Sequence, residues 1–177
     1  LLLLLLLLLL AAPNRAAMIA LCLSAETENV ARISVPQDHT FFLRLRCTTC
    51  HEETPNAVGV SRDDVVEGIR GASVNLKYKC KGCGREHDIT VQPYDEKDAW
   101  TEGGKEWQRI AAFECRGMDP YEYEIRDGYQ VEAADGSKFE DVDLSDDWMD
   151  VDGKGNPVSI SNVKARLEGA KAEKKKK

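Results

Sequence analysis

The ten residues KYKCKGCGRE, numbers 77–86, contain two cysteines, Cys80 and Cys83, with Gly82 between them and Gly84 directly after. A C-x-x-C pair of this kind can hold a metal ion, act as a redox dithiol or supply half of a disulfide framework. Which of the three applies determines how the neighbouring strands are expected to meet.

A second pair, Cys47 and Cys50, occurs upstream in the same kind of setting. Both pairs end segments in which apolar and polar residues alternate, FFLRLRC (41–47) and VNLKYKC (74–80), the pattern of half-buried strands. Four thiolates on two hairpin turns form the ligand set of a closed tetrahedral zinc site, and glycine supplies the backbone angles that such turns need. We therefore predict one Zn²⁺ per chain, with four ligands: Cys47, Cys50, Cys80 and Cys83.

Three alternatives to zinc exist for these cysteines. A redox dithiol normally follows a strand and opens a helix, whereas each pair here is followed by another strand pattern. A disulfide framework requires an oxidising compartment. Iron can also occupy a four-cysteine site, and that alternative stays open.

The remaining cysteines and histidines are expected to lie outside the ligand set. Because four thiolates close the coordination shell, His39, His51 and His87 are predicted to be surface side chains or neighbours of the ligands. Cys22 falls on the polar phase of its strand pattern and is predicted to be a bystander. Cys115 is predicted to be a packed core thiol.

Alternation with a period of two residues recurs between Met18 and Val163 and predicts a mostly-β protein of short strands. Further strands are expected at 19–24, 86–93, 107–115, 121–125 and 158–163. The run 95–105, rich in charge and glycine, is predicted to be an exposed loop. The stretch SRDDVVEGI (61–69) is the one place where Ser61 or Asp63 could cap one or two helical turns.

A faint internal repeat links FLRLRCTTCHEE (42–53) with IAAFECRGMDPYEY (110–123). The alignment matches Cys47 with Cys115 and replaces Cys50 by Met118. Duplication followed by loss of the site would explain it, and so would chance similarity between two β-hairpins.

The formal net charge is −7 and the pI is near 5.1, which disfavours a nucleic-acid-binding module because phosphate neutralisation needs a basic face. Thirteen acidic residues against two basic ones fall in 119–152, and this stretch lacks the ligand register of an EF-hand. It is predicted to be a solvated acidic face or a docking surface for a basic partner. Sequence motifs of hydrolases, phosphate loops and dinucleotide sites are missing.

The ends of the chain differ from the rest. Residues 1–17 begin with ten leucines, too few to span a bilayer, and are predicted to be a low-complexity leader, with a signal peptide as the alternative. Residues 164–177 are predicted to be a basic disordered tail. The expected zinc-binding β domain is 18–163, with an N-terminal half of about 18–93 and a C-terminal half of about 94–163.

With these residues in place, the chain resembles the eukaryotic CXXC-motif-containing zinc-binding protein family. The likeness rests on five segments in order: IALCLSAETENV (19–30), LRCTTCHE (45–52), RGASVNLKYKCKGCGREHDITVQPYD (70–95), FECRGMDP (113–120) and FEDVDLSDDWMDVD (139–152). It implies two pseudo-symmetric β-sheet halves, sandwich- or barrel-like, with one zinc in the N-terminal half on the four cysteines named above. It also implies an intracellular location and no enzymatic activity.

We therefore expect a non-enzymatic intracellular zinc-binding protein that acts through protein–protein contacts, in metal or redox homeostasis. The partner is unidentified, a metal-handling protein being one candidate, and neither nucleic acid nor membrane is expected. The chain is expected to be a monomer in the cytoplasm, with the nucleus as an alternative. The competing hypothesis is a thiol–disulfide oxidoreductase that uses one C-x-x-C pair.

Overall fold

The computed structural model describes residues 16–170, and within that range all the regular structure is β-strand. Its fifteen strands are β1 (Ala17–Glu28), β2 (Val30–Ser34), β3 (Thr40–Cys47), β4 (Val58–Ser61), β5 (Val66–Glu67), β6 (Ser73–Val74), β7 (Leu76–Lys79), β8 (Glu86–Val91), β9 (Trp100–Thr101), β10 (Gln108–Arg116), β11 (Met118–Glu124), β12 (Tyr129–Ala133), β13 (Lys138–Val142), β14 (Trp148–Val151) and β15 (Pro157–Gly169). The predicted β class is confirmed. No helix in the described range is long and apolar enough to cross a membrane. Most of the predicted leader, residues 1–15, and the last part of the predicted tail, 171–177, lie outside the described residues.

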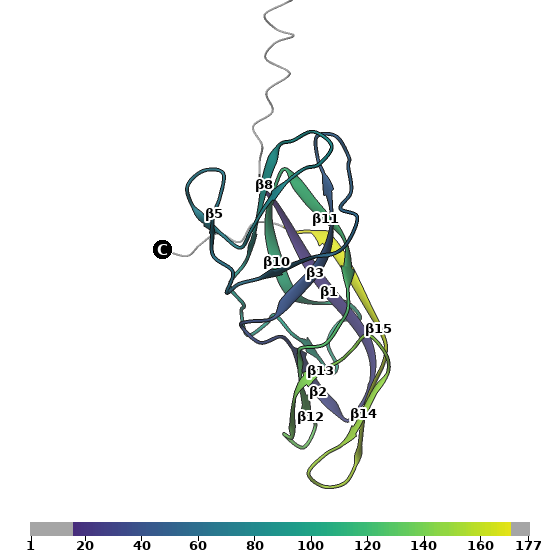
Figure 1. Ribbon diagram of the computed structural model, residues 1–177. Helices are drawn as coiled ribbons and strands as arrows, with labels where there is room; N and C mark the ends of the chain where they lie inside the picture. The colour runs from purple at the N-terminus through teal and green to yellow at the C-terminus, as the bar shows by residue number, and fades with distance from the viewer. Residues whose placement is uncertain (1–15, 171–177) are drawn as a thin grey trace, which may run out of the picture.

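The strands form one large curled sheet and three smaller ones (Figure 1). The six-stranded sheet has the order β14-β15-β1-β10-β8-β7. The others are β11-β3-β4, β13-β12-β2-β9 and the short pair β5-β6. The large sheet is therefore centred on β1 and β10, with a hairpin at each edge.

The core lies between the large sheet and the strands that pack on it. Leu21 and Leu23 of β1, Phe41 and Leu43 of β3, and Phe113 of β10 are fully buried. The rings of Phe41 and Phe113 meet edge to face with centroids 5.2 Å apart. Burying each such side chain contributes about 1.5–3 kcal/mol, so the apolar alternation seen in the sequence accounts for how β3 is held against the large sheet.

The two halves of the chain build the same strand pattern and exchange strands. Hairpin β7–β8 of the first half pairs with β10 of the second, and hairpin β14–β15 of the second pairs with β1 of the first. The order β11-β3-β4 corresponds in the same way to β2-β12-β13. The equivalent strands are β1 and β10, β2 and β11, β3 and β12, β4 and β13, β7 and β14, β8 and β15. The pseudo-symmetry is thus present, with the halves interlocked.

This topology changes the alignment of the internal repeat. Strand β3, which ends at Cys47, corresponds to β12, which ends at Ala133, whereas Cys115 lies in β10. Met118 is the residue opposite Cys47 across the β11–β3 pair. The predicted match of Cys47 with Cys115 is therefore wrong. Apolar alternation is common to every strand here, so it could not determine which strands correspond.

Strand β15 continues beyond the predicted end of the domain at residue 163. Val163, Ala165 and Leu167 pack against the core, and the charged residues between them face outward. The strand pairs with β1 as far as Ile19 opposite Gly169. The part of the predicted tail up to Gly169 is therefore strand. The sequence does not predict it, because a small residue, Ala165, and charged neighbours obscure the apolar alternation.

Two local predictions also differ from the structure. The predicted exposed loop 95–105 contains Trp100, which is 7% exposed and lies in β9 opposite Ile33 of β2. The stretch 61–69 forms a turn and then β5, with the amide of Ser61 donating to Asp64 Oδ2 at 3.2 Å. Val65 and Ile69, which would share one face of a helix, are 69% and 43% exposed.

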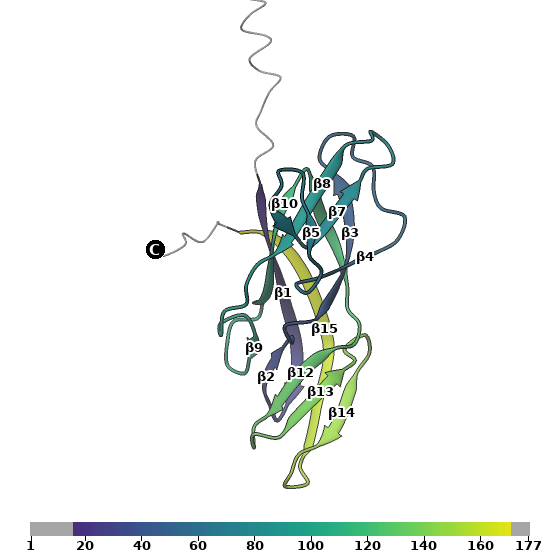
Figure 2. The same cartoon turned by 60° about the vertical axis from the view of Figure 1, so that its left-hand side comes forward.

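The molecule is elongated, and its hairpin turns gather at two opposite ends (Figures 1 and 2). The turns after β3 and between β7 and β8 lie at the upper end in both views. The turns between β12 and β13 and between β14 and β15 lie at the lower end. We call residues 47–52 and 80–85 the knuckle turns, and residues 133–137 and 152–156 the C-terminal turns.

Candidate metal centre

The knuckle turns bring the four predicted cysteines together. Their Sγ atoms all lie within 4.8 Å of one another. Two sulfur contacts join the two turns, at 3.7 Å between Cys47 and Cys83 and 3.5 Å between Cys50 and Cys80. Four sulfur atoms around zinc at about 2.3 Å are about 3.8 Å apart in a regular tetrahedron. The cluster therefore has the size that a zinc ion needs.

The backbone of each knuckle turn folds back on its first cysteine. In the first turn the amide of Cys47 donates to the carbonyl of Glu52 at 2.9 Å, and the amide of His51 donates to the carbonyl of Cys47 at 3.0 Å. His51 has a left-handed backbone, with φ of 62°. The second turn has the same two bonds, both 2.9 Å, Cys80 to Arg85 and Gly84 to Cys80. The two-residue spacing thus points both thiols of each pair to one side.

Gly82 lies where the two knuckle turns approach each other. A Cβ atom at this position would be 3.3 Å from Cys50 Sγ and 3.1 Å from the Cβ of Glu52. Both are closer than most Cβ contacts in proteins. Glycine at this position therefore lets the second turn come close to a ligand of the first.

The surroundings of the thiols differ within the cluster. Cys47 and Cys80 are buried, and Cys50 and Cys83 are exposed. Burial raises the pKa of Cys47, but hydrogen bonds from the amides of Cys50 and Thr49 and from the thiols of Cys50 and Cys83 together outweigh it and lower that pKa to about 6. The Glu52 amide lowers the pKa of Cys50, yet partial desolvation of this exposed thiol and its contacts with the other thiols raise it to about 12. Crowded thiols ionise together only when a cation compensates their charge, which is what a bound metal supplies.

His87 contacts the cluster without belonging to it. It is 2% exposed, and its Nε2 lies 3.3 Å from Cys47 Sγ. A thiolate carries no proton, so Nε2–H donates to sulfur when Cys47 is ionised. The Nδ1 atom has no hydrogen-bond partner among residues 16–170. His87 is therefore a neighbour of a ligand, as the sequence predicted.

The other residues predicted to lie outside the ligand set differ in their surroundings. His51 is exposed, and His39 is buried between the carbonyl of Gly128 and the hydroxyl of Tyr123. Cys115 is 1% exposed, which confirms the predicted core thiol.

Cys22 is also buried, at 4% exposure, and its Sγ lies 3.4 Å from Glu168 Oε1. Its predicted placement on a polar face is wrong. The register of β1 against β10 shifts between Leu21 and Cys22, and this section of β1 is buried on both faces.

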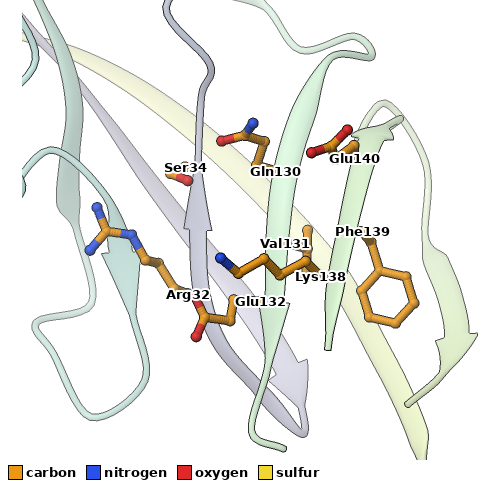
Figure 3. Close-up of a pocket in the computed structure, with 8 residues that line it drawn as sticks. All are labelled: Arg32, Ser34, Gln130, Val131, Glu132, Lys138, Phe139 and Glu140. Carbon is orange, nitrogen blue, oxygen red and sulfur yellow. The ribbon is translucent and has the colours of Figure 1, made fainter. Parts of the chain in front are cut away.

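A separate shallow cavity of about 170 Å³ lies on the sheet formed by β2, β12 and β13 (Figure 3). Lys138 of β13 extends over β12, while Arg32 of β2 donates to the carbonyl of Glu96 at 3.0 Å. Glu132 of β12 is the register partner of both residues. The sequence did not single out this cavity, and its lining shares no residue with the cysteine cluster.

Comparisons with known proteins agree with this site. The family model described as "CXXC motif containing zinc binding protein, eukaryotic" matches residues 20–168. A Drosophila melanogaster protein named "UPF0587 protein CG4646" is 34% identical over 143 residues, which is 78% of this chain and 88% of that protein. A Homo sapiens protein named "CXXC motif containing zinc binding protein" is 33% identical over 146 residues, 77% of this chain and 88% of that protein.

Solved structures share the fold. The one titled "Crystal Structure of C1orf123" has a TM-score of 0.78 and 29% sequence identity, and the match covers 86% of this chain and 99% of that one. A "Hypothetical protein from plasmodium falciparum" has a TM-score of 0.77 over 85% of this chain and 99% of its own. At 23% identity, that second likeness concerns the fold alone.

Proposed function

The chain belongs to the eukaryotic family of CXXC-motif-containing zinc-binding proteins, and we propose that its zinc ion is held as a structural site by Cys47, Cys50, Cys80 and Cys83. The observation that carries the proposal is the pair of sulfur contacts between the knuckle turns, 3.5 and 3.7 Å, because they match the edge of a zinc–thiolate tetrahedron. Bound zinc would tie two hairpins that are separate in the sequence.

The proposed role of the site is structural and not catalytic. Four protein thiolates leave no open position for a substrate or a water molecule, and the family is named for zinc binding with no enzymatic name. In a dithiol enzyme the two cysteines of one C-x-x-C exchange electrons as a pair. Here sulfur contacts of 3.5 and 3.7 Å join one pair to the other, which favours metal binding over that chemistry.

The proposed mode of action is contact with a protein partner that carries a basic surface. Asp143, Asp146, Asp147 and Asp150 are exposed in the stretch between β13 and the end of β14. A surface of one sign attracts a partner of the opposite sign and raises the rate of encounter. We place this activity in the cytoplasm, in metal or redox homeostasis, with the chain acting as a monomer.

The ligand assignment is tested by metal analysis of the purified protein together with X-ray absorption at the zinc edge. The expected result is about one zinc per chain, with four sulfur ligands at about 2.3 Å. Nitrogen or oxygen among the ligands would contradict the assignment and would implicate His87. Thiol titration separates the redox alternative, since a closed zinc site gives four slowly reacting thiols and a redox dithiol reacts fast without metal.

A further inference from the structure

The C-terminal turns, at the other end of the molecule, are closed by the same two kinds of backbone hydrogen bond as the knuckle turns, each across one residue fewer. In each, the first residue donates to a carbonyl past the turn, and a left-handed residue donates back to the first. The bonds are Ala133 to Ser137, 2.8 Å, and Gly136 to Ala133, 2.9 Å, in one turn, and Asp152 to Asn156, 2.9 Å, and Gly155 to Asp152, 3.0 Å, in the other. Gly136 and Gly155 have φ of 89° and 82°, in the left-handed region where His51 and Gly84 also lie.

A backbone hydrogen bond next to the first turn at each end of the molecule is also equivalent between the two ends. Thr48, after Cys47, donates its amide to the carbonyl of Gly117 at 3.0 Å, and Ala134, after Ala133, donates to the carbonyl of Asn29 at 2.9 Å. Gly117 and Asn29 are the left-handed residues between β10 and β11 and between β1 and β2. The equivalence therefore extends beyond the turns into the exchanged strands.

The correspondence assigns an equivalent to each zinc ligand. Each C-terminal turn is one residue shorter than its counterpart, and alignment on the first residue and the left-handed residue gives four pairs. They are Cys47 with Ala133, Cys50 with Asp135, Cys80 with Asp152 and Cys83 with Lys154.

Side-chain proximity supports this alignment independently of the backbone bonds. A Cβ at Gly153 would lie 3.4 Å from Asp135 Oδ2, and a Cβ at Gly82 would lie 3.3 Å from Cys50 Sγ. The carboxylate of Asp135 thus approaches the second C-terminal turn as the thiol of Cys50 approaches the second knuckle turn.

Hydrogen bonds centred on Asp152 close the C-terminal turns. Its Oδ1 accepts from the amides of Lys154, 2.9 Å, and Asn156, 2.8 Å, and its Oδ2 accepts from Asn156 Nδ2 at 2.9 Å. The amide of Gly153 donates to Ser137 Oγ at 2.9 Å and so joins one turn to the other. Asp152 is 7% exposed. The Asn156 hydrogen bond first, and then the amides and the charge of Lys154, lower the pKa of Asp152.

We propose that the C-terminal turns are a converted metal site, in which hydrogen bonds of Asp152 and Ser137 do what zinc does in the knuckle turns. The molecule then has one end whose order depends on zinc and one end whose order does not. Zinc occupancy acts as a conformational switch confined to the knuckle end, while the acidic C-terminal end presents the same surface in both states. This inference rests on the zinc ligands proposed above.

Hydrogen exchange of the full chain, with and without a chelator, tests the switch. After zinc removal the amides of residues 47–52 and 80–85 are expected to exchange at least about tenfold faster, and those of residues 133–137 and 152–156 are expected to stay within about twofold. Acceleration at both ends, or at neither, would overturn the proposal. Zinc content of Cys80→Ser is measured separately, so that a wrong ligand assignment is distinguished from a failed switch.

The reciprocal variant is Asp152→Ala. It is expected to accelerate exchange in the C-terminal turns and to leave one zinc per chain, because only the metal-free end loses its closing contacts. Asp152→Asn, which keeps an acceptor oxygen, is the matched control and is expected to exchange more slowly than Asp152→Ala. Loss of zinc from Asp152→Ala, or unchanged exchange, would contradict the independence of the two ends.

The equivalence itself is tested by rebuilding the site. A chain carrying Ala133→Cys, Asp135→Cys, Asp152→Cys and Lys154→Cys, with one residue inserted between the two new cysteines of each turn to restore the two-residue spacing, is expected to bind two zinc ions, and the unchanged chain in excess zinc is expected to bind one. A folded quadruple variant with one zinc, or a second ion in the unchanged chain, would refute the conversion. If the variant does not fold, the two exchange experiments still decide the proposal.

Discussion

Cys80 and Cys115 show how the same buried residue type differs with its surroundings. Cys80 lies 3.5 Å from the thiol of Cys50, in the sulfur cluster. Cys115 is 1% exposed in the apolar core, and burial raises its pKa well above the ordinary value. The first is placed to bind metal together with its neighbours, and the second is held as a neutral thiol by its apolar surroundings.

Replacing each of these cysteines by serine should therefore have different results. Cys80→Ser is expected to abolish zinc binding and to lower the melting temperature, since a ligand is lost. Cys115→Ser is expected to keep the zinc and to cost about 1–3 kcal/mol of stability, because a hydroxyl is buried without a partner. Metal content and thermal melting with and without a chelator check both. Zinc loss from Cys115→Ser would show that the cluster depends on more than its four thiols.

His39 is part of a buried hydrogen-bond chain with a defined direction. Its Nδ1–H donates to the carbonyl of Gly128, 3.1 Å away, so the neutral ring accepts at Nε2 from the hydroxyl of Tyr123, 3.4 Å away. Tyr123 in turn accepts from the hydroxyl of Tyr129 at 2.6 Å. Burial lowers the pKa of His39, although the Gly128 bond and the nearby acids oppose it.

The burial of His39 in this hydrogen-bond chain predicts that the stability of the protein depends on pH. The folded state holds His39 neutral below its unfolded pKa of about 6.5, so the unfolded state binds more protons as the pH falls. The free energy of unfolding should therefore be highest above about pH 6.5 and should decrease below it. Denaturant titrations at pH 8, 6 and 5 check this. In His39→Gln the slope between these values should be smaller, and an unchanged slope would exclude His39 as the source.

Tyr129→Phe is the matched control for that experiment. It removes the last hydroxyl of the hydrogen-bond chain and keeps the imidazole of His39. We therefore expect the free energy of unfolding to fall by about 0.5–1.5 kcal/mol, by the same amount at every pH.

At the scale of the strand, the sequence predicts best where apolar residues alternate with polar ones. β3, β7 and β8 were predictable for that reason, and with them the positions of the four cysteines. Hairpin β12–β13 was missed although its turn contains Asp135-Gly136, a common hairpin dipeptide, because acidic residues dominate the stretch around it. The end of β15 was missed because its inward side chains, Ala165 among them, are small or only half-buried.

Two truncations test the importance of the end of β15. A chain that ends at Val163 loses the pairing of β15 with residues 19–24 of β1 and the packing of Leu167. Leu167 is half-buried, so its loss alone should cost about 1.5 kcal/mol, and the melting temperature should fall by several degrees. A chain that ends at Ala170 keeps the whole strand and is expected to have the same melting temperature as the full-length protein. Equal melting of both truncations would show that this part of β15 contributes nothing.

At the scale of the whole molecule, the exchanged strands were beyond the reach of the sequence. The spacing of Cys47 with Cys50 and of Cys80 with Cys83 is local, so the ligand set could be predicted. Which strand pairs with which depends on contacts between residues far apart, such as Cys115 opposite Ile89, and alternation alone does not specify them. For the same reason the correspondence of Asp152 with Cys80 appears only in three dimensions.

The interlocked halves predict that neither half folds alone. Residues 16–93 lack the β10 partner of β8, and residues 94–170 lack the β1 partner of β15. Each fragment is expected to show no cooperative thermal transition, and the two produced together are expected to form a zinc-containing complex that melts cooperatively. A stable isolated fragment with native dispersion in its NMR spectrum would refute this.

The position of β1 at the centre of the large sheet also has a consequence for biosynthesis. Ala20, on one of the first described strands to leave the ribosome, pairs with Glu168 on the last. At about 5–20 residues per second, roughly 7–30 s of translation separate the two. Both knuckle turns are complete after residue 85, when barely half of the chain has been made. A nascent chain can thus acquire its metal while the sheet that will enclose it is still being synthesised.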